Sequence, residues 1–217
     1  MTGDQSIEGK GDSPSAHGTG GTGGTGTTGG RGTTRADPDA TARFFGYGSL
    51  VNRATHDYAP ARRARLAGWR RVWVHVPVRP VAFLSVEPAE GCAIAGLVAD
   101  VPGGDWAALD AREHAYIRHP VAARAGDLVL PAQVYAVPRD TARSPSARNP
   151  ILLSYLDTVV QGFLDEYGEA GVADFFASTT GWHAPVADDR ANPRYPRARA
   201  LSGAGRALVD HWLARLR

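Results

Sequence analysis

The sequence predicts an α+β fold with a mixed or closed β-sheet, followed by a helical C-terminal part. Alternating or continuous apolar runs indicate strands between residues 42 and 137, and helical periodicity takes over from residue 151. One short helical segment interrupts the strand region, so helices do not alternate with strands as they do in a doubly wound fold. This order favours strands and helices that are segregated within one domain.

Residues 1–40 differ in composition from the rest of the chain. They hold 12 glycines and 8 threonines, and Ile7 is the only large aliphatic residue after Met1. Such a segment cannot bury enough apolar surface to offset its ordering entropy. We therefore expect a disordered tail over residues 1–40 and a single domain over residues 41–217, with its helical part from about residue 150.

Strands are predicted where apolar residues alternate or form short runs bounded by turn residues. Val72, Val74 and Val76 alternate with Trp73 and His75, which is the period of a strand. The predicted strands cover residues 42–47, 65–76, 81–86, 92–101, 121–124 and 128–137. The last two flank a Gly-Asp pair and are expected to form a hairpin.

Helices are predicted after Asp105 and in the C-terminal third. Asp105 is an N-cap candidate for a short helix that places Trp106, Leu109 and Glu113 on one face. Helical spacing of apolar residues then predicts segments at residues 151–167, 172–176 and 205–216. Gly168 is expected to end the first of these three.

Charge and composition argue against several functional classes. The formal charge is +2, Lys10 is the only lysine, and the arginines are mixed with acids and have no aromatic stacking platform, so nucleic-acid binding is not expected. No window approaches the roughly 18 apolar residues that a membrane span requires. Cys92 is the only cysteine and is expected to be a small buried apolar residue. Its isolation fits a reducing compartment, and we expect a cytoplasmic protein.

The stretch GYGSLV, residues 46–51, raises two functional readings that its own residues argue against. Gly46 and Gly48 match the first two glycines of a dinucleotide-binding loop, but Val51 occupies the third position and no acidic residue follows about 20 residues later. A serine nucleophile at Ser49 would require glycines two residues before and after it, where Tyr47 and Val51 stand. Ser49 is therefore expected to bind substrate or form the turn. A serine hydrolase remains a distant alternative.

Glu113 occupies a position where helical periodicity predicts an apolar residue. A carboxylate turned towards the core is poorly solvated, which raises its pKa from about 4.3 towards the range useful for proton transfer at neutral pH. Alternatively, Glu113 pairs with Arg112 or Arg118, or turns outward at the helix end. Asp110 is the other carboxylate of this helix and suits a local hydrogen bond. No two histidines stand four residues apart, so no metal site is expected.

These stretches together resemble the γ-glutamylcyclotransferase-like family, including its ChaC-type and AIG2-like members. The resemblance covers roughly residues 42–140 and rests on order and spacing. The matching residues are Tyr47, Gly48, Ser49 and Leu50, then Gly96, then Leu109, Asp110, Arg112, Glu113, Tyr116, Arg118 and Val121. The remainder, to the C-terminus, is similar to the helical extension of bacterial members.

The resemblance implies a mixed β-barrel with flanking helices whose cavity holds a γ-glutamyl group. It implies that backbone N–H groups of Gly48, Ser49 and Leu50 bind the substrate and that Glu113 is the general acid and base. Glu113 would accept a proton from the substrate's α-amino group, which closes a lactam, 5-oxoproline, and releases an amine. No cofactor is expected, and the expected partner is a small γ-glutamyl compound. The sequence does not indicate an oligomeric state.

Several assignments stay open at this stage. Tyr47 either faces the substrate or packs in the core, and Tyr116 either bonds to the substrate or packs at the helix end. A turn-rich segment after residue 181 could fold over the mouth of the barrel or be anchored by its aromatic residues. Its candidate residues are Trp182, Arg190, Tyr195 and Arg197. The runner-up function is a barrel of the same fold that binds a small molecule without turnover.

Overall fold

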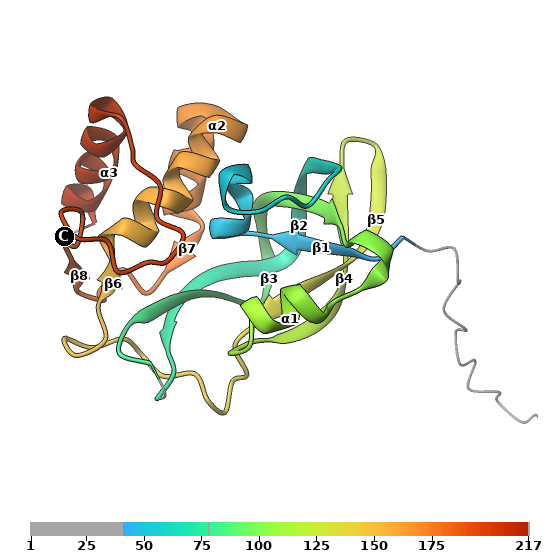
Figure 1. The fold of residues 1–217 in the computed structure, drawn as a ribbon, viewed down its shortest axis with the longest axis horizontal. Coiled ribbons are helices and arrows are strands. Elements are labelled where there is room, and N and C mark those ends of the chain that lie inside the picture. Colours follow the sequence, from blue (N-terminus) through green and yellow to red (C-terminus); the bar gives the residue numbers. More distant parts are fainter. Residues whose placement is uncertain (1–40, 78, 217) are drawn as a thin grey trace, which may run out of the picture. The chain divides into compact units, whose positions relative to one another are not determined.

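The structure is a computed structural model that describes residues 41–77 and 79–216. The expected tail, residues 1–40, lies outside the described residues. Within them, five strands close into a mixed β-barrel flanked by helices, which confirms the predicted fold class (Figure 1).

The barrel strands are joined in the order β3-β1-β5-β4-β2, and β2 pairs again with β3 to close the ring. Only the β1–β5 pair is parallel within this ring. The strands are β1 (Arg43–Gly46), β2 (Ala61–His75), β3 (Ala82–Asp100), β4 (Ile117–Ala125) and β5 (Leu128–Ala136). Three two-residue strands, β6 (Ile151–Leu152), β7 (Thr179–Thr180) and β8 (Val186–Ala187), lie outside the ring. The expected hairpin of the last two barrel strands is β4–β5.

The prediction of two separate strands at residues 81–86 and 92–101 is wrong, because β3 runs through both. Its antiparallel ladder with β2 continues past an irregularity between Ala67 and Trp69, where Pro88 lies opposite Trp69. A proline cannot donate to a ladder, but it is tolerated at a bulge. Cys92 is exposed, contrary to expectation, because this part of the hairpin extends beyond the core.

The helices of the described residues lie between the barrel strands and after them. The short ones are η1 (Ser49–Val51), η2 (Arg53–Thr55), η3 (Pro102–Gly104) and α1 (Ala107–Arg112), and the long ones are α2 (Leu153–Ala177) and α3 (Gly203–Arg215). Gly168 has non-helical torsion angles, φ 67° and ψ −168°, inside α2. The two helices predicted at residues 151–167 and 172–176 are therefore the two parts of α2. No helix of the described residues is long and apolar enough to cross a membrane.

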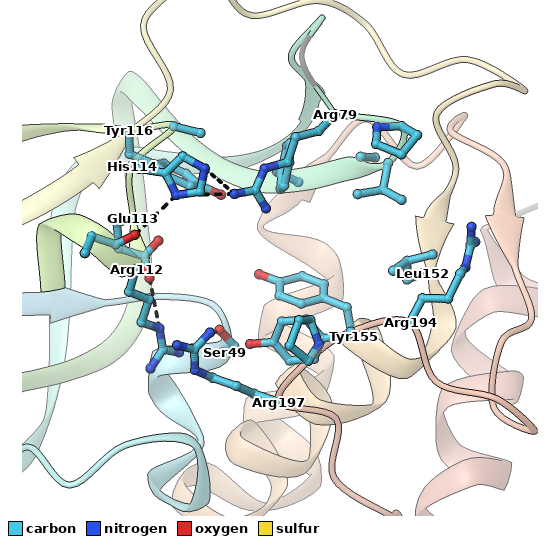
Figure 2. Close-up of a pocket in the computed structure, with 18 residues that line it drawn as sticks. Ser49, Arg79, Arg112, Glu113, His114, Tyr116, Leu152, Tyr155, Arg194 and Arg197 are labelled. Carbon is cyan, nitrogen blue, oxygen red and sulfur yellow. Dashed lines mark hydrogen bonds and ion pairs between the residues drawn. The ribbon is translucent and has the colours of Figure 1, made fainter. Parts of the chain in front are cut away.

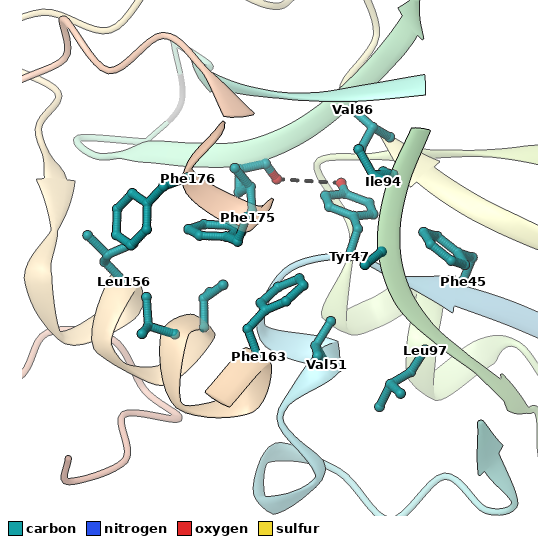
Figure 3. Packing of buried hydrophobic residues seen from close by; sticks show 14 of the residues in the cluster. Phe45, Tyr47, Val51, Val86, Ile94, Leu97, Leu156, Phe163, Phe175 and Phe176 are labelled. Carbon is teal, nitrogen blue, oxygen red and sulfur yellow. Dashed lines mark hydrogen bonds between the residues drawn. The ribbon is translucent and has the colours of Figure 1, made fainter. Parts of the chain in front are cut away.

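The main core lies between the barrel and α2 (Figure 3). Phe45 and Leu97 from the barrel and Phe163 and Phe175 from α2 are all at most 1% exposed. The Phe163 and Phe175 ring centroids lie 5.0 Å apart. Burial of such aromatic side chains is the dominant favourable contribution to folding, so α2 is part of the fold of the barrel rather than an appended cover.

A close approach joins α2 to the segment that follows β1. A Cβ atom on Gly162 would lie 2.5 Å from the Asn52 backbone nitrogen, so only glycine allows this contact. The Asn52 side chain donates to the Thr158 carbonyl and to Gln161 Oε1, both at 2.9 Å. Helix α2 therefore fixes the position of the chain directly after the GYGSL stretch.

Candidate functional site

A cavity of about 540 Å³ opens between the end of α1, the start of β3, the start of α2 and the segment before α3 (Figure 2). Its inner end continues into a small pocket of about 30 Å³ beside the GYGSL stretch. Ser49, Glu113, Tyr116 and Tyr155 line both spaces. The sequence therefore brings the two predicted motifs, residues 47–50 and Glu113, to one place.

Tyr47 is a buried residue at the inner pocket. Its hydroxyl donates to the Tyr135 carbonyl at 2.7 Å and lies 3.5 Å from the Leu84 carbonyl, and the residue is 7% exposed. Burial raises the pKa of the Tyr47 phenol well above its ordinary value, so it stays protonated. The Tyr47 side chain is therefore part of the core and also lines the inner pocket, so its contact with a substrate stays a prediction.

The Arg71 guanidinium holds the backbone at Tyr47 in place. Its Nε donates to the Tyr47 carbonyl at 2.9 Å, one Nη donates to Ser178 Oγ at 2.7 Å, and the other donates to the Ala95 carbonyl. Its carbon lies 4.8 Å from the centre of the Phe163 ring. Arg71 is fully buried and thus connects β2, β3, the end of α2 and the GYGSL stretch.

Gly48, Ser49 and Leu50 all line the inner pocket, and the Leu50 side chain is in addition part of the core. A Cβ atom on Gly48 would lie 2.9 Å from the Tyr155 hydroxyl, so the close approach requires glycine. Leu50 is 8% exposed and packs in a second core cluster with Phe44. In the described residues, the Gly48 and Leu50 N–H groups have no hydrogen-bond acceptor, as is usual at the first turn of a helix.

Glu113 is the C-cap of α1, and its side chain is 16% exposed. Its backbone N–H donates to the Leu109 carbonyl at 2.9 Å, so the inward stripe through the buried Leu109 continues to Glu113. The carboxylate also pairs with Arg112, at 3.1 Å from Nε. The two interpretations of Glu113, inward and paired, therefore both describe it.

Burial raises the pKa of the Glu113 carboxyl above its ordinary value. The positive charges of Arg112 and Arg197 and the hydrogen bond from Arg112 oppose this rise. A carboxyl group with a raised pKa at the end of a cavity is suited to accepting and returning a proton near neutral pH. Arg118 lies instead 3.2 Å from Asp110, which also accepts a hydrogen bond from the Tyr135 hydroxyl at 2.5 Å.

Two further tyrosines surround Glu113. The Tyr116 hydroxyl donates to the Leu84 carbonyl at 3.1 Å, and the Tyr155 hydroxyl lies beside Gly48 and Ser49. Burial raises the pKa of both phenols, so they supply polar hydroxyl groups without charge. Tyr116 both lines the cavity and is bonded to the barrel.

Ser49 does not have the surroundings of a nucleophile. Its hydroxyl accepts a hydrogen bond of 3.3 Å from Arg112, and within the described residues it contacts no histidine. Both ring nitrogens of the nearby His56 are occupied, by the Leu50 carbonyl at 3.0 Å and the Tyr58 N–H at 3.2 Å. The described residues contain no group of three or more His, Cys, Asp or Glu side chains that could hold a metal ion.

The turn-rich segment after residue 181 divides between the two expected roles. Tyr195 and Arg197 line the cavity, and the Tyr195 ring meets Tyr155 edge-on with centroids 5.0 Å apart. Trp182 stacks on Phe176 with centroids 5.0 Å apart. Arg190 pairs with Asp157 at 2.7 Å and with Asp210 at 2.8 Å. Two of the four residues therefore lie at the mouth, and two anchor the segment.

Comparison with known protein families supports the family resemblance that the sequence shows. The sequence profile described as "Gamma-glutamyl cyclotransferase, AIG2-like" matches residues 44–153, about half of the chain. The chain belongs to this family. The matched region contains the GYGSL stretch and Glu113, and it ends at the start of α2. No curated protein sequence matches the chain significantly.

Solved structures share the fold of this gamma-glutamyl cyclotransferase family member at low sequence identity. One described as "Gamma-glutamyl cyclotransferase" aligns with a TM-score of 0.52 and 13% identity over 79% of this chain and 99% of that one. The uncharacterized protein loc79017 from Homo sapiens gives 0.54 and 14% over the same shares. YkqA from Bacillus subtilis gives 0.55 and 16% over 68% of this chain and 56% of its own. These likenesses show the fold alone.

Three residues at the cavity of this family member escape sequence reasoning. Helical periodicity assigns Tyr155 to the apolar stripe of the segment at residues 151–167, and only its hydroxyl, in a mainly aliphatic stripe, signals another role. Arg79 stands between two prolines, and Arg194 stands in the segment before α3. No pattern of the sequence distinguishes these two arginines from the others.

Proposed function

We propose that the protein cyclises a γ-glutamyl compound to 5-oxoproline and releases the amine that was bound to the γ-carbonyl, in the cytoplasm. The observation that carries the proposal is the position of Glu113. Its carboxyl group faces the inner pocket next to Gly48 and Ser49, and burial raises its pKa. The family supplies the type of compound, and the site supplies a base beside the backbone N–H groups of Gly48 and Leu50, which have no acceptor within the described residues.

Glu113 acts first as a base. The substrate's α-ammonium group first releases one proton to the solvent. Its neutral nitrogen then attacks the γ-carbonyl carbon, a new C–N bond closes the five-membered ring, and Glu113 takes one of the two remaining protons from that nitrogen. Because both groups belong to one molecule, a correctly folded substrate replaces a bimolecular encounter. Such proximity corresponds to effective concentrations of about 10⁵ M or more.

The backbone next to Gly48 stabilises the charge that develops on the carbonyl oxygen. The N–H groups of Gly48, Ser49 and Leu50 are fixed by η1, by Arg71 and by the contact of Asn52 with α2. Donors that are already oriented need no reorganisation when the oxyanion forms. The Leu50 side chain plays no part in this step because it packs in the core.

Glu113 then acts as an acid. The oxyanion re-forms the carbonyl, the bond to the departing nitrogen breaks, and the protonated Glu113 gives its proton to that nitrogen. The products are 5-oxoproline and a free amine, and Glu113 returns to its ionised state. The neutral phenols of Tyr116 and Tyr155 line this space without competing for the proton.

The test is to incubate the protein with γ-glutamyl amino acids, peptides and amines and to measure 5-oxoproline by mass spectrometry. Glu113→Gln should abolish the product while the protein stays folded. The matched control is Asp110→Asn, because Asp110 belongs to the same helix but is bonded to Tyr135 and Arg118 outside the cavity. Absence of product from every compound would contradict the enzymatic proposal and leave a binding protein. Unchanged turnover in Glu113→Gln would remove Glu113 from its role.

A further inference from the structure

The cavity of about 540 Å³, here called the wide part to distinguish it from the inner pocket, carries a large excess of positive charge. Four arginines line it, and Glu113 is its only acidic side chain. Arg112 is paired with Glu113. The remaining three are Arg79, Arg194 and Arg197. Within the described residues, none of these three forms a salt bridge with a carboxylate of the protein, so their charge is available to a ligand.

Arg79 lies on the β3 side of the cavity (Figure 2). Its guanidinium donates to Nε2 of His114, whose Nδ1 donates to the Ala111 carbonyl at 3.3 Å. The guanidinium carbon lies 5.3 Å from the centre of the Phe83 ring. The His114 and Phe83 rings orient the guanidinium and carry no negative charge that would neutralise it. Arg79 therefore faces the cavity as a positioned positive charge.

Arg197 comes from the segment before α3, away from Arg79 in the view of Figure 2. Like Arg112, it lines the cavity and acts as a positive charge on Glu113. Its segment is held by backbone contacts: the Arg194 N–H donates to Asp189 at 2.9 Å, and the Tyr195 N–H lies 3.4 Å from Ser154 Oγ. Like charges that line one cavity repel each other unless an anion lies between them. The wide part of the cavity is therefore suited to bind a negatively charged group of a ligand.

The charge of the substrate distinguishes the candidate compounds. Every γ-glutamyl compound carries one carboxylate and one ammonium on its glutamyl part. A γ-glutamyl alkylamine brings no further charge, whereas a γ-glutamyl amino acid or peptide brings a second carboxylate on the part that becomes the released amine. Three unpaired guanidiniums exceed what one carboxylate can balance.

We propose that Arg79 and Arg197 bind the carboxylate of the released part, so that the protein acts on γ-glutamyl amino acids or peptides in preference to γ-glutamyl alkylamines. This inference rests on the proposed function for the position of the glutamyl group, whose reacting carbonyl lies at the inner pocket. The released part then extends into the wide part of the cavity. Guanidinium–carboxylate hydrogen bonds are charge-assisted and lose much of their strength when the partner is neutral.

The test compares two substrates that differ only in this charge, γ-glutamyl-alanine and γ-glutamyl-alaninamide. We expect kcat/KM for 5-oxoproline formation to be about tenfold or more higher for the acid. Arg79→Gln and Arg197→Gln should each reduce the ratio towards one by lowering turnover of the acid alone. Arg62→Gln is the matched control, because Arg62 is an exposed arginine of β2 outside the cavity. Equal kcat/KM for the two substrates would overturn the inference.

A binding experiment separates this inference from the proposed chemistry. Calorimetry with the Glu113→Gln variant measures the affinity for both compounds without turnover. Tighter binding of the acid, lost in the additional Arg79→Gln and Arg197→Gln variants, supports the charge preference even if the wild type forms no 5-oxoproline. Equal affinities overturn the preference, whatever the turnover of the wild type.

Discussion

The Arg112 guanidinium lies 3.1 Å from the Glu113 carboxylate at the inner end of the cavity. Arg112 is itself held by the Thr55 carbonyl at 3.1 Å and by Ser49 Oγ at 3.3 Å. One cation thus contacts both the proposed base and the stretch that is proposed to bind the substrate. Burial raises the Glu113 pKa, and this contact, together with the charge of Arg197, limits the rise.

The first prediction concerns pH. Glu113 must be ionised to accept a proton, so activity is lost as the pH falls through its raised pKa, at a pH above the usual range of about 4.3 for glutamate. Arg112→Gln removes a charge that lowers this pKa, so the acidic limb of kcat/KM should move to higher pH. Arg118→Gln is the control, because Arg118 pairs with Asp110 instead. If the acidic limb of the kcat/KM profile lies at the same pH in Arg112→Gln as in the wild type, this prediction is contradicted.

The second prediction concerns Arg71. Arg71→Met leaves the carbonyls of Tyr47 and Ala95 and the Ser178 hydroxyl without their buried donor. We expect a loss of about 3 kcal/mol or more in the free energy of unfolding, measured by urea denaturation. The neighbouring Arg70 is the control: its side chain is 46% exposed and pairs with Glu87, so Arg70→Met should cost less than about 1 kcal/mol. Similar losses at the two positions would contradict the role of Arg71.

The third prediction compares two glycines of helices. In Gly162→Ala the new Cβ would lie 2.5 Å from the Asn52 backbone, which cannot give way without shifting the segment after η1. We expect a loss of about 1–3 kcal/mol in unfolding free energy and a lower kcat. Gly203→Ala meets no atom within 4 Å and should be neutral or slightly stabilising. Equal thermal midpoints for the two variants would show that the contact with Asn52 is not tight.

The fourth prediction concerns Ser49. Its hydroxyl forms one hydrogen bond, of 3.3 Å, with Arg112, so Ser49→Ala should lower kcat/KM by about tenfold or less. Catalysis by Glu113 and catalysis by a nucleophilic Ser49 differ in a second observation. A nucleophilic serine would give a covalent acyl-enzyme in the wild type, visible by intact-protein mass spectrometry, and an inactive alanine variant. We expect no such adduct.

The barrel and the pairing of Glu113 with the GYGSL stretch could be predicted from the sequence. Local signals identified the two segments, because the turn at Gly48 and the helix face that carries Leu109 and Glu113 are both set by residues adjacent in the chain. The resemblance then related the two segments. The length of β3 could not be predicted, because Pro88 is tolerated only through its position opposite a bulge in β2.

The residues that depend on distant partners also escaped prediction. Arg71 belongs to a run of arginines that reads as a solvated strand face, and it is buried because carbonyls from β3 and the GYGSL stretch meet it. The core position of the Leu50 side chain was not predicted either, because it depends on Phe44 and the rest of the second core cluster, whereas the role expected for the Leu50 backbone N–H stays a prediction. Such roles follow from tertiary packing, which no local periodicity encodes.

The segment from Arg194 to Arg197 lies beyond the region that the family profile matches, residues 44–153. The proposed base and the backbone donors lie inside that region. The proposed chemistry and part of the proposed choice of amine are therefore carried by separate stretches of the chain. Exchange of the stretch before α3 is thus a route by which one barrel could keep its reaction and acquire another substrate.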